Sequence, residues 1–145
     1  MKTVLFLCSA NYYRSRFAEQ VFNWLAESSG MQWRADSRGL MVGGWGNIGP
    51  ISSYAVEGLR ARGIPINGHN RFPRQVTHDD FANADLTIAV KESEHRPVMA
   101  NQFPRWVDQI EYWHIDDLDC AEPEDALPVL AEHVRALVAR LNGSG

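Results

Sequence analysis

The chain has 145 residues, of which 45% are apolar and 22% are charged, and its formal net charge is -4 at pH 7. This length fits one compact domain, and the proportions are those of an average globular protein, so neither a disordered nor a membrane-spanning class is favoured. The acidic net charge argues against a nucleic-acid partner, because such partners require a clustered basic surface.

The first predicted element is a strand at residues 4–7. Its continuous apolar run is typical of a strand that is covered on both faces. From Ser15 onward, apolar residues recur at helical spacing until residues 28–30, which predicts an amphipathic helix. The seven residues that join the two elements are Cys8, Ser9, Ala10, Asn11, Tyr12, Tyr13 and Arg14.

The next segment predicts a short strand at residues 32–37 and then a long surface loop from Gly39 to Pro50 with five glycines. Pro50 suits the first turn of a helix, and Gly63 suits its end. The side chains that we expect this helix to bury are Ile51, Tyr54, Ala55 and Leu59.

The second half of the chain predicts a helical turn at residues 79–81, a strand at 84–90, a helix at 92–100 and a strand at 109–115. The last helix has the clearest pattern, since apolar residues step by three and four up to Leu141. Strands that alternate with helices imply a parallel sheet with helices on both faces. We therefore predict a single three-layer α/β domain over residues 1–141, followed by a flexible tail at 142–145.

Cys8 and Cys120 are the two cysteines, too few for a disulfide framework and without the paired spacing of a zinc site. The apolar run before Cys8 is too short for a signal sequence. No later run reaches the roughly 18–20 apolar residues that span a bilayer. We expect a cytoplasmic protein with no membrane partner.

Cys8 is predicted to lie where doubly wound sheets bind ligands, between the carboxyl end of a strand and the start of a helix. Inward-pointing amides and the helix dipole favour an anion there, such as a phosphoryl group, inorganic phosphate or sulfate. A cysteine in such a place ionises readily and becomes a nucleophile. Arg14 can bind two oxygens of the phosphoryl group, and Ser15 can donate its hydroxyl to the thiolate.

The spacing of Cys8 and Arg14 is a weak signal by itself. A cysteine at the end of a buried strand is most often part of the packing, and an arginine six residues away is common by chance. The position of the pair between an apolar strand and an amphipathic helix favours the catalytic interpretation.

In the segment from Cys8 to Ser15, the sequence resembles the low-molecular-weight protein tyrosine phosphatases. Their strand is followed by Cys-x-x-Asn-x-x-Arg-Ser, which Cys8, Asn11, Arg14 and Ser15 match. The resemblance implies a four-stranded parallel sheet in the order 2-1-3-4, hydrolysis without metal or cofactor, and a phosphocysteine intermediate. It extends through Asp36-Ser37, Gly63-Ile64-Pro65, Arg74-Gln75-Val76, Asp80-Phe81, Ala84-Asp85-Leu86 and Glu92-Ser93.

The resemblance also implies a general acid late in the chain. Counting from the last strand places Asp117 at that position, with Asp116 and Asp119 as competitors and a solvated acidic loop as the alternative. One carboxyl can protonate the leaving group and later take a proton from the attacking water.

Other positions either match the family pattern or depart from it. Asn11 resembles the residue that holds the loop in a left-handed conformation, and His69 resembles a histidine that braces it. Trp45 either walls the substrate cleft or is buried packing. Asp119 stands where an aromatic side chain often forms another wall, which weakens the case for phosphotyrosine. The other departures from the family pattern are Ala10, Tyr13, Arg16 and Leu118.

We therefore predict a cysteine-dependent phosphatase that acts on a phosphorylated protein or a small aryl phosphate. One alternative is a phosphate-binding regulatory module without catalysis. Another is an arsenate reductase, which needs a resolving thiol that only Cys120 can supply. A phosphocysteine carrier of sugar transport is a third alternative, for which Arg14 would be unexpected.

Overall fold

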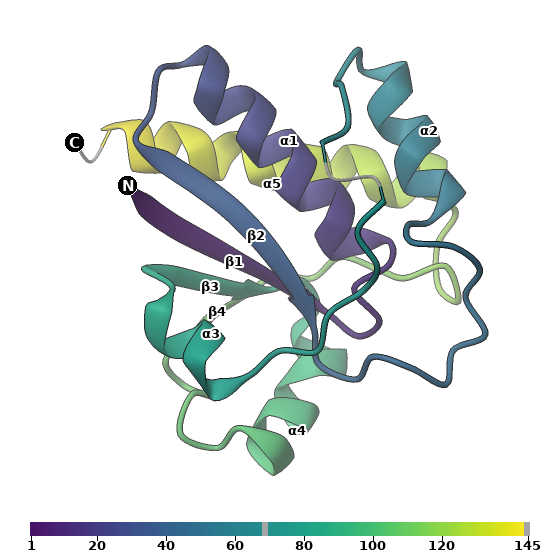
Figure 1. Cartoon of the computed structure of the whole chain (residues 1–145), viewed down its shortest axis with the longest axis vertical. Coiled ribbons are helices and arrows are strands. Elements are labelled where there is room, and N and C mark those ends of the chain that lie inside the picture. Colours follow the sequence, from purple (N-terminus) through teal and green to yellow (C-terminus); the bar gives the residue numbers. More distant parts are fainter. Residues whose placement is uncertain (68–69, 144–145) are drawn as a thin grey trace.

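A four-stranded parallel sheet forms the centre of the computed structural model, which describes residues 1–67 and 70–143 (Figure 1). Hydrogen bonds connect the strands in the order β2-β1-β3-β4, and every neighbouring pair is parallel. The predicted order is therefore confirmed, and β1 lies inside the sheet with Cys8 at its end. The strands are β1 (Lys2–Cys8), β2 (Trp33–Gly39), β3 (Leu86–Ala89) and β4 (Glu111–Tyr112).

Helices cover both faces of the sheet, so the predicted three-layer arrangement is confirmed as well. The helices α1, α2 and α5 lie on one side of the sheet in Figure 1, and α3 and α4 lie on the other. Their bounds are α1 (Arg14–Ser28), α2 (Ser53–Ala61), α3 (His78–Asn83), α4 (Glu92–Gln102) and α5 (Pro123–Gly143).

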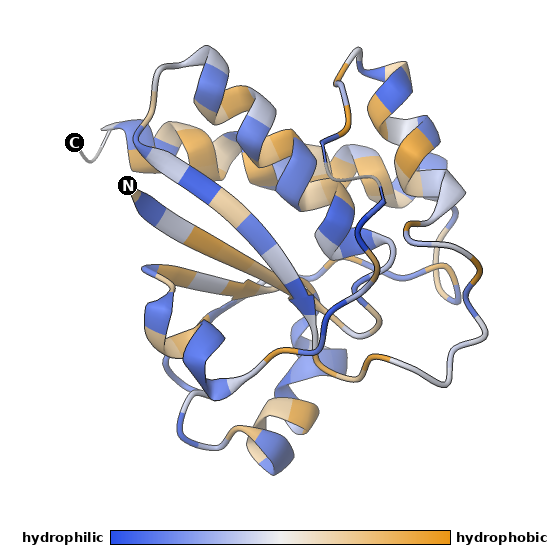
Figure 2. Cartoon of the chain, viewed as in Figure 1, coloured by the Kyte–Doolittle hydropathy of each residue, from blue (hydrophilic) through white to orange (hydrophobic). Residues whose placement is uncertain are grey.

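The side chains of β1 alternate between two hydrophobic cores. Val4 and Phe6 pack with residues of α1, α2 and α5, whereas Leu5 and Leu7 pack with residues of α3 and α4. Successive side chains of a strand point to opposite faces, so a continuous apolar run serves both cores. Figure 2 shows this run as a hydrophobic stretch of β1 between amphipathic helices. The interpretation of residues 4–7 as a doubly covered strand is confirmed.

Several predicted boundaries differ from those observed. The predicted helix start at Pro50 is wrong, because the Ser52 hydroxyl accepts a hydrogen bond from the Tyr54 amide and caps α2 one residue before Ser53. Tyr54 was expected to be buried, but it is 48% exposed. The strand predicted at residues 109–115 is shorter, since only Glu111 and Tyr112 pair with β3.

Two helices end later in the chain than the sequence predicts. The helix α4 continues through Pro97 to Gln102, beyond the predicted end at Ala100. The helix α5 reaches Gly143, so residues 142 and 143 are helical rather than part of the predicted tail. Residues 144 and 145 lie outside the described part of the chain. In residues 1–67 and 70–143, no helix has the length and apolar character needed to cross a membrane.

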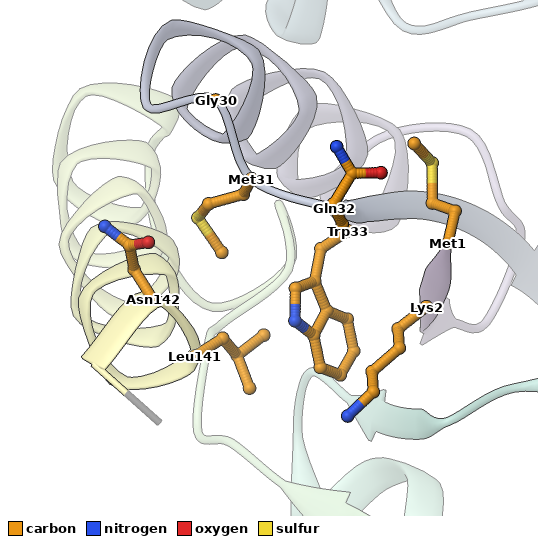
Figure 3. A pocket seen from close by; sticks show the side chains of 8 residues that line it. All are labelled: Met1, Lys2, Gly30, Met31, Gln32, Trp33, Leu141 and Asn142. Atoms are coloured by element: carbon orange, nitrogen blue, oxygen red, sulfur yellow. The ribbon is translucent and has the colours of Figure 1, made fainter. Parts of the chain in front are cut away.

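A cavity of about 510 Å³ opens at the amino ends of β1 and β2, next to the last turn of α5 (Figure 3). Met31, Trp33 and Leu141 line it, and the Lys2 ammonium lies 5.6 Å from the centre of the Trp33 ring. Cys8 ends β1 at the opposite edge of the sheet. This cavity is therefore separate from the predicted phosphate loop.

Candidate active site

The loop from Cys8 to Arg14 joins the carboxyl end of β1 directly to the first residue of α1. It is tied to the chain that follows β2, because the amides of Leu40 and Met41 donate to the Cys8 and Ser9 carbonyls, both at 2.9 Å. Residues 9–13 therefore lie between the end of β1 and the start of α1, and the loop is bound at its beginning to the chain that follows β2. This is the strand, loop and helix arrangement that the sequence predicts for an anion site.

The sulfur of Cys8 is buried beside a hydroxyl. Cys8 is 3% exposed, and its Sγ lies 2.9 Å from Ser15 Oγ. The Asn11 amide group donates to the same Ser15 oxygen at 2.9 Å, so the single Ser15 proton is free to point at the sulfur. A hydroxyl that donates to a thiolate stabilises its negative charge.

Asn11 adopts the left-handed backbone conformation that the resemblance implied, with φ of 53°. Its fully buried side chain also donates to Ser37 Oγ at 2.9 Å, and its Oδ1 accepts from Arg71 Nη1 at 3.1 Å and from the Arg74 amide at 3.0 Å. These bonds offset the cost of the backbone conformation and fix the shape of the loop.

The brace predicted from His69 lies outside the described residues. Within the described chain, Arg71 contacts Asn11, and it is oriented by Ser37 Oγ at 2.9 Å and by Glu19 Oε1 at 3.2 Å. Burial raises the pKa of Glu19, although its hydrogen bond from Ser37 opposes this. No sequence signal indicated Arg71, because it is 60 residues from Asn11.

Arg14 is 2% exposed and is surrounded by oxygen atoms. Its Nη2 lies 2.8 Å from Glu94 Oε2 and 3.2 Å from Asp117 Oδ2, and its Nη1 donates to the Ile115 carbonyl at 3.0 Å. Burial alone would lower the pKa of Arg14, but the negative charges of Cys8, Glu94 and Asp117 outweigh it and raise the pKa. The guanidinium therefore stays charged inside the protein.

The three acidic candidates for the general acid lie in different surroundings. Asp117 is partly buried and lies next to Arg14, at 3.2 Å. Asp116 is engaged with Lys91, at 2.9 Å from its Nζ, and Asp119 is exposed. Of the three, Asp117 is the one that contacts the residues of the loop.

Glu94 and His95 belong to the site, although no motif in the sequence indicated them. Glu94 Oε2 accepts hydrogen bonds from Arg14, from the Ser9 hydroxyl and from His95 Nε2 at 3.0 Å. Burial raises the pKa of Glu94, but these donors outweigh it and hold the pKa well below its usual range. The available signal was their place in the first turn of the helix after β3, at the same edge of the sheet as Cys8.

The other loop residues, Ala10, Tyr12 and Tyr13, have different surroundings. The Tyr12 hydroxyl donates to the Ile48 carbonyl at 2.5 Å and so connects the loop to the glycine-rich segment. Tyr13 is buried, and burial together with the nearby Asp117 raises the pKa of its phenol to about 12. Ala10 and Trp45 both line a cavity of about 300 Å³, and Trp45 is 51% exposed rather than buried packing.

Beyond the carboxyl ends of the parallel strands, the Cys8 sulfur thus lies next to the Ser15 hydroxyl, and the buried Arg14 lies next to Asp117. Among the described residues, no group of three His, Cys, Asp or Glu side chains could hold a metal ion. This combination of a cysteine loop, an arginine and a late aspartate defines the class of cysteine-dependent phosphatases.

The model of the family described as "Low molecular weight phosphotyrosine protein phosphatase" matches residues 3–142. The chain belongs to this family, which confirms the resemblance and the predicted enzyme class of phosphatase hydrolases. The protein-arginine-phosphatase of Bacillus subtilis is 32% identical over 74% of this chain, and the low molecular weight protein-tyrosine-phosphatase YfkJ of the same organism is 38% identical over 62%. The matched segments span 67% and 56% of those relatives.

Solved structures of similar proteins match more of this chain than the two curated relatives do. The low molecular weight protein tyrosine phosphatase from T. tengcongensis is 28% identical, with a TM-score of 0.78 and coverage of 100% of both chains. The structure of YfkJ from Bacillus subtilis is 26% identical, with a TM-score of 0.81 over 99% of this chain and 96% of that one. The described part of the chain therefore has the fold of the family.

Proposed function

We propose that this chain hydrolyses phosphate monoesters through a phosphocysteine formed on Cys8. The observation that carries the proposal is the position of Cys8 Sγ, 2.9 Å from the Ser15 hydroxyl, in a loop that ends at the buried Arg14. Loop amides, the positive end of the α1 dipole and the guanidinium together suit a dianionic phosphoryl group. We expect inorganic phosphate or sulfate to bind there as well.

In the first step, the Cys8 thiolate attacks phosphorus, so that an S–P bond forms and the P–O bond to the leaving group breaks. Arg14 stabilises the charge on the equatorial oxygens. Asp117 gives its proton to the leaving oxygen, which departs as a neutral alcohol or phenol. The position of Asp117 at 3.2 Å from Arg14 supports this role, because both must reach the same phosphoryl group.

In the second step, water attacks the phosphocysteine and Asp117, now ionised, accepts a proton from it. The S–P bond breaks, and the sulfur leaves as a thiolate that the Ser15 hydroxyl stabilises. Inorganic phosphate is released and Asp117 is again protonated. One ester and one water thus give one alcohol and one phosphate, without a metal or cofactor in any step.

For the substrate, we propose a phosphorylated protein carrying phosphotyrosine, with small aryl phosphates as simpler substrates. The support is the half-exposed Trp45 ring beside Ala10 of the loop. Its indole N–H donates to the Met41 carbonyl at 2.6 Å, which orients the ring. An aryl leaving group can stack on such a surface. The relatives named above act on phosphoarginine and phosphotyrosine proteins by their names, which favours a protein substrate.

We also propose a cytoplasmic location. The mechanism needs Cys8 as a free thiol, and a reducing compartment maintains it in that state. Cys8 and Cys120 are both free cysteines in the structure, which is compatible with this location.

The test is hydrolysis of an aryl phosphate by the purified chain. We expect turnover that Cys8→Ser abolishes and that Cys120→Ser, a change at an exposed cysteine, leaves intact. Binding of phosphate without turnover would instead favour the regulatory module. Thiol consumption that depends on arsenate and on Cys120 would favour the reductase.

A further inference from the structure

Glu94 connects the two ends of the phosphate loop. Its Oε2 accepts from the Ser9 hydroxyl and from Arg14 Nη2 at 2.8 Å, and its Oε1 accepts from Arg14 Nη1 at 3.3 Å. Ser9 follows the nucleophile, and Arg14 is the last residue of the loop. One carboxylate on α4 therefore holds residues on both sides of the loop.

His95 holds Glu94 from behind. It is fully buried, and its Nδ1 accepts the Lys91 amide hydrogen at 3.2 Å. The ring proton must then be on Nε2, which lies 3.0 Å from Glu94 Oε2 and 3.1 Å from Ser9 Oγ. Burial lowers the pKa of His95, and the nearby Arg14 supports this, although the hydrogen bond to Glu94 opposes it. The ring is therefore a neutral donor in a fixed orientation.

These contacts determine which edge of the Arg14 guanidinium faces a substrate. Nη1 donates to Glu94 Oε1 and to the Ile115 carbonyl, so both of its hydrogens are engaged. Nη2 donates one hydrogen to Glu94 Oε2. Nη2 also lies 3.2 Å from Asp117 Oδ2. Among the hydrogen bonds of the described residues, the Arg14 edge made by Nε and Nη2 still has donors for two phosphoryl oxygens, next to Asp117. A guanidinium that is bound in this way is pre-organised for bidentate contact.

We propose that Glu94 is a positioning residue for phosphoryl transfer, which acts by orienting Arg14 and anchoring Ser9 without touching the substrate. This inference rests on the proposed function and deepens it. The carboxylate is ionised before phosphate arrives, and the positive charge of Arg14 compensates it. Binding of phosphate then requires no rearrangement of the arginine, which favours affinity and rate together.

The experiment compares wild type with Glu94→Gln and Glu94→Asp. The kinetics with phenyl phosphate give kcat/KM, and calorimetry with inorganic phosphate gives a dissociation constant that needs no turnover. Gln removes the charge and Asp keeps it but is too short by one methylene group. We expect either change to lower kcat/KM and weaken phosphate binding, each by roughly ten- to a hundredfold, the size of a lost charge-assisted hydrogen bond. Glu92→Gln is the matched control, because Glu92 pairs with Arg96 on the same helix.

A double-mutant cycle separates positioning from a general structural effect. If Glu94 acts through Arg14, adding Glu94→Gln to Arg14→Lys should weaken phosphate binding by less than threefold beyond Arg14→Lys alone. Additive losses would contradict the inference. So would tighter phosphate binding in Glu94→Gln, because Glu94 would then compete with phosphate for Arg14.

Ser9→Ala provides a second, milder variant should a Glu94 variant not fold. It removes one donor to Glu94 Oε2 with little change in volume, so we expect a several-fold weaker affinity for phosphate. Unchanged phosphate binding in Ser9→Ala would overturn the role of the loop anchor. Absence of turnover in the wild type would instead overturn the proposed function and leave the calorimetric comparison decisive for Glu94.

Discussion

At the scale of single residues, the site is a short chain of hydrogen bonds that ends at a sulfur atom. Asn11 donates to Ser15, and the Ser15 hydroxyl faces Cys8. Each donor in this chain is directed, since Asn11 is itself held by Arg71 and by the Arg74 amide. A directed hydroxyl supports the thiolate both as the attacking group and as the leaving group.

The role of Asp117 gives a prediction at this scale. Asp117→Asn removes the proton donor, so kcat for phenyl phosphate should fall by about 10²- to 10⁴-fold. The loss should be smaller with p-nitrophenyl phosphate, whose leaving group needs less protonation. The measurement is steady-state kinetics with both esters. Asp116→Asn is the control, since the Asp116 carboxylate pairs with Lys91. If kcat fell more in Asp116→Asn than in Asp117→Asn, Asp116 would be the general acid.

Some of these residues were predictable and others were not, for a physical reason. Cys8, Asn11, Arg14 and Ser15 lie within eight positions, so their spacing along the loop is visible in the sequence. Glu94 reaches the site across 80 positions from Arg14, through a fold that no local pattern encodes. Long-range contacts of this kind depend on where the helix after β3 is placed.

At the scale of elements, the end of β2 supports the phosphate loop. Gly39 pairs with Cys8 across the sheet, and a Cβ atom at position 39 would lie 2.8 Å from the Ser9 carbonyl oxygen and 3.1 Å from the Ala10 carbonyl carbon. Both neighbours are backbone atoms of the loop. The loop can therefore approach β2 this closely only because residue 39 has no side chain.

Gly39→Ala should displace the loop. We expect the free energy of unfolding to fall by about 1–3 kcal/mol, as for other overpacked sites, and phosphate binding to weaken. Urea denaturation and calorimetry measure the two effects. Gly143→Ala is the control, because nothing lies within 4 Å of a Cβ placed there. Equal phosphate affinities in wild type and Gly39→Ala would show that the loop does not need this close approach.

Helices and strands were predictable where their apolar pattern was long. They were less predictable where tertiary contacts determine the end of the element. The apolar pattern of α5 runs from Leu127 to Leu141 and predicts the helix, although the helix itself extends from Pro123 to Gly143. The strand β4 is only two residues long, although the chain after it stays beside the end of β3, where the Trp113 and Ile115 amides donate to the Ala89 and Val90 carbonyls. A strand pattern in the sequence does not show where pairing with the neighbour stops.

At the scale of the whole molecule, the parallel sheet places residues from distant parts of the chain at one edge. Cys8 comes from the end of β1, Glu94 from the helix after β3, and Asp117 from the segment after β4. Parallel strands direct all their carboxyl ends to the same side. The topology therefore assembles the site. The site contains buried titratable groups, and their ionisation affects the stability of the fold.

The buried His95 makes stability depend on pH. Its pKa is lowered in the folded state, so below about pH 6.5 the unfolded chain binds a proton that the folded chain does not. The free energy of unfolding should therefore rise with pH through this window, and fall as pH drops from 7 towards 5. In His95→Gln this part of the slope should be absent. Urea denaturation at several pH values measures it.

His114→Gln is the control for this prediction, because the His114 side chain is 73% exposed. We expect its slope to equal that of the wild type. An equal slope in His95→Gln would mean that His95 titrates in the folded protein as it does in the unfolded chain.

The most direct test of the proposed mechanism is to trap the covalent intermediate. Asp117→Asn should slow hydrolysis of the phosphocysteine, so rapid mixing with p-nitrophenyl phosphate, an acid quench and mass spectrometry of the digested protein should detect it. We expect one added phosphoryl group on the peptide that contains Cys8, and none in Cys8→Ser. A peptide that remains unmodified while nitrophenol is released in a burst, or a phosphoryl group on another residue, would contradict it.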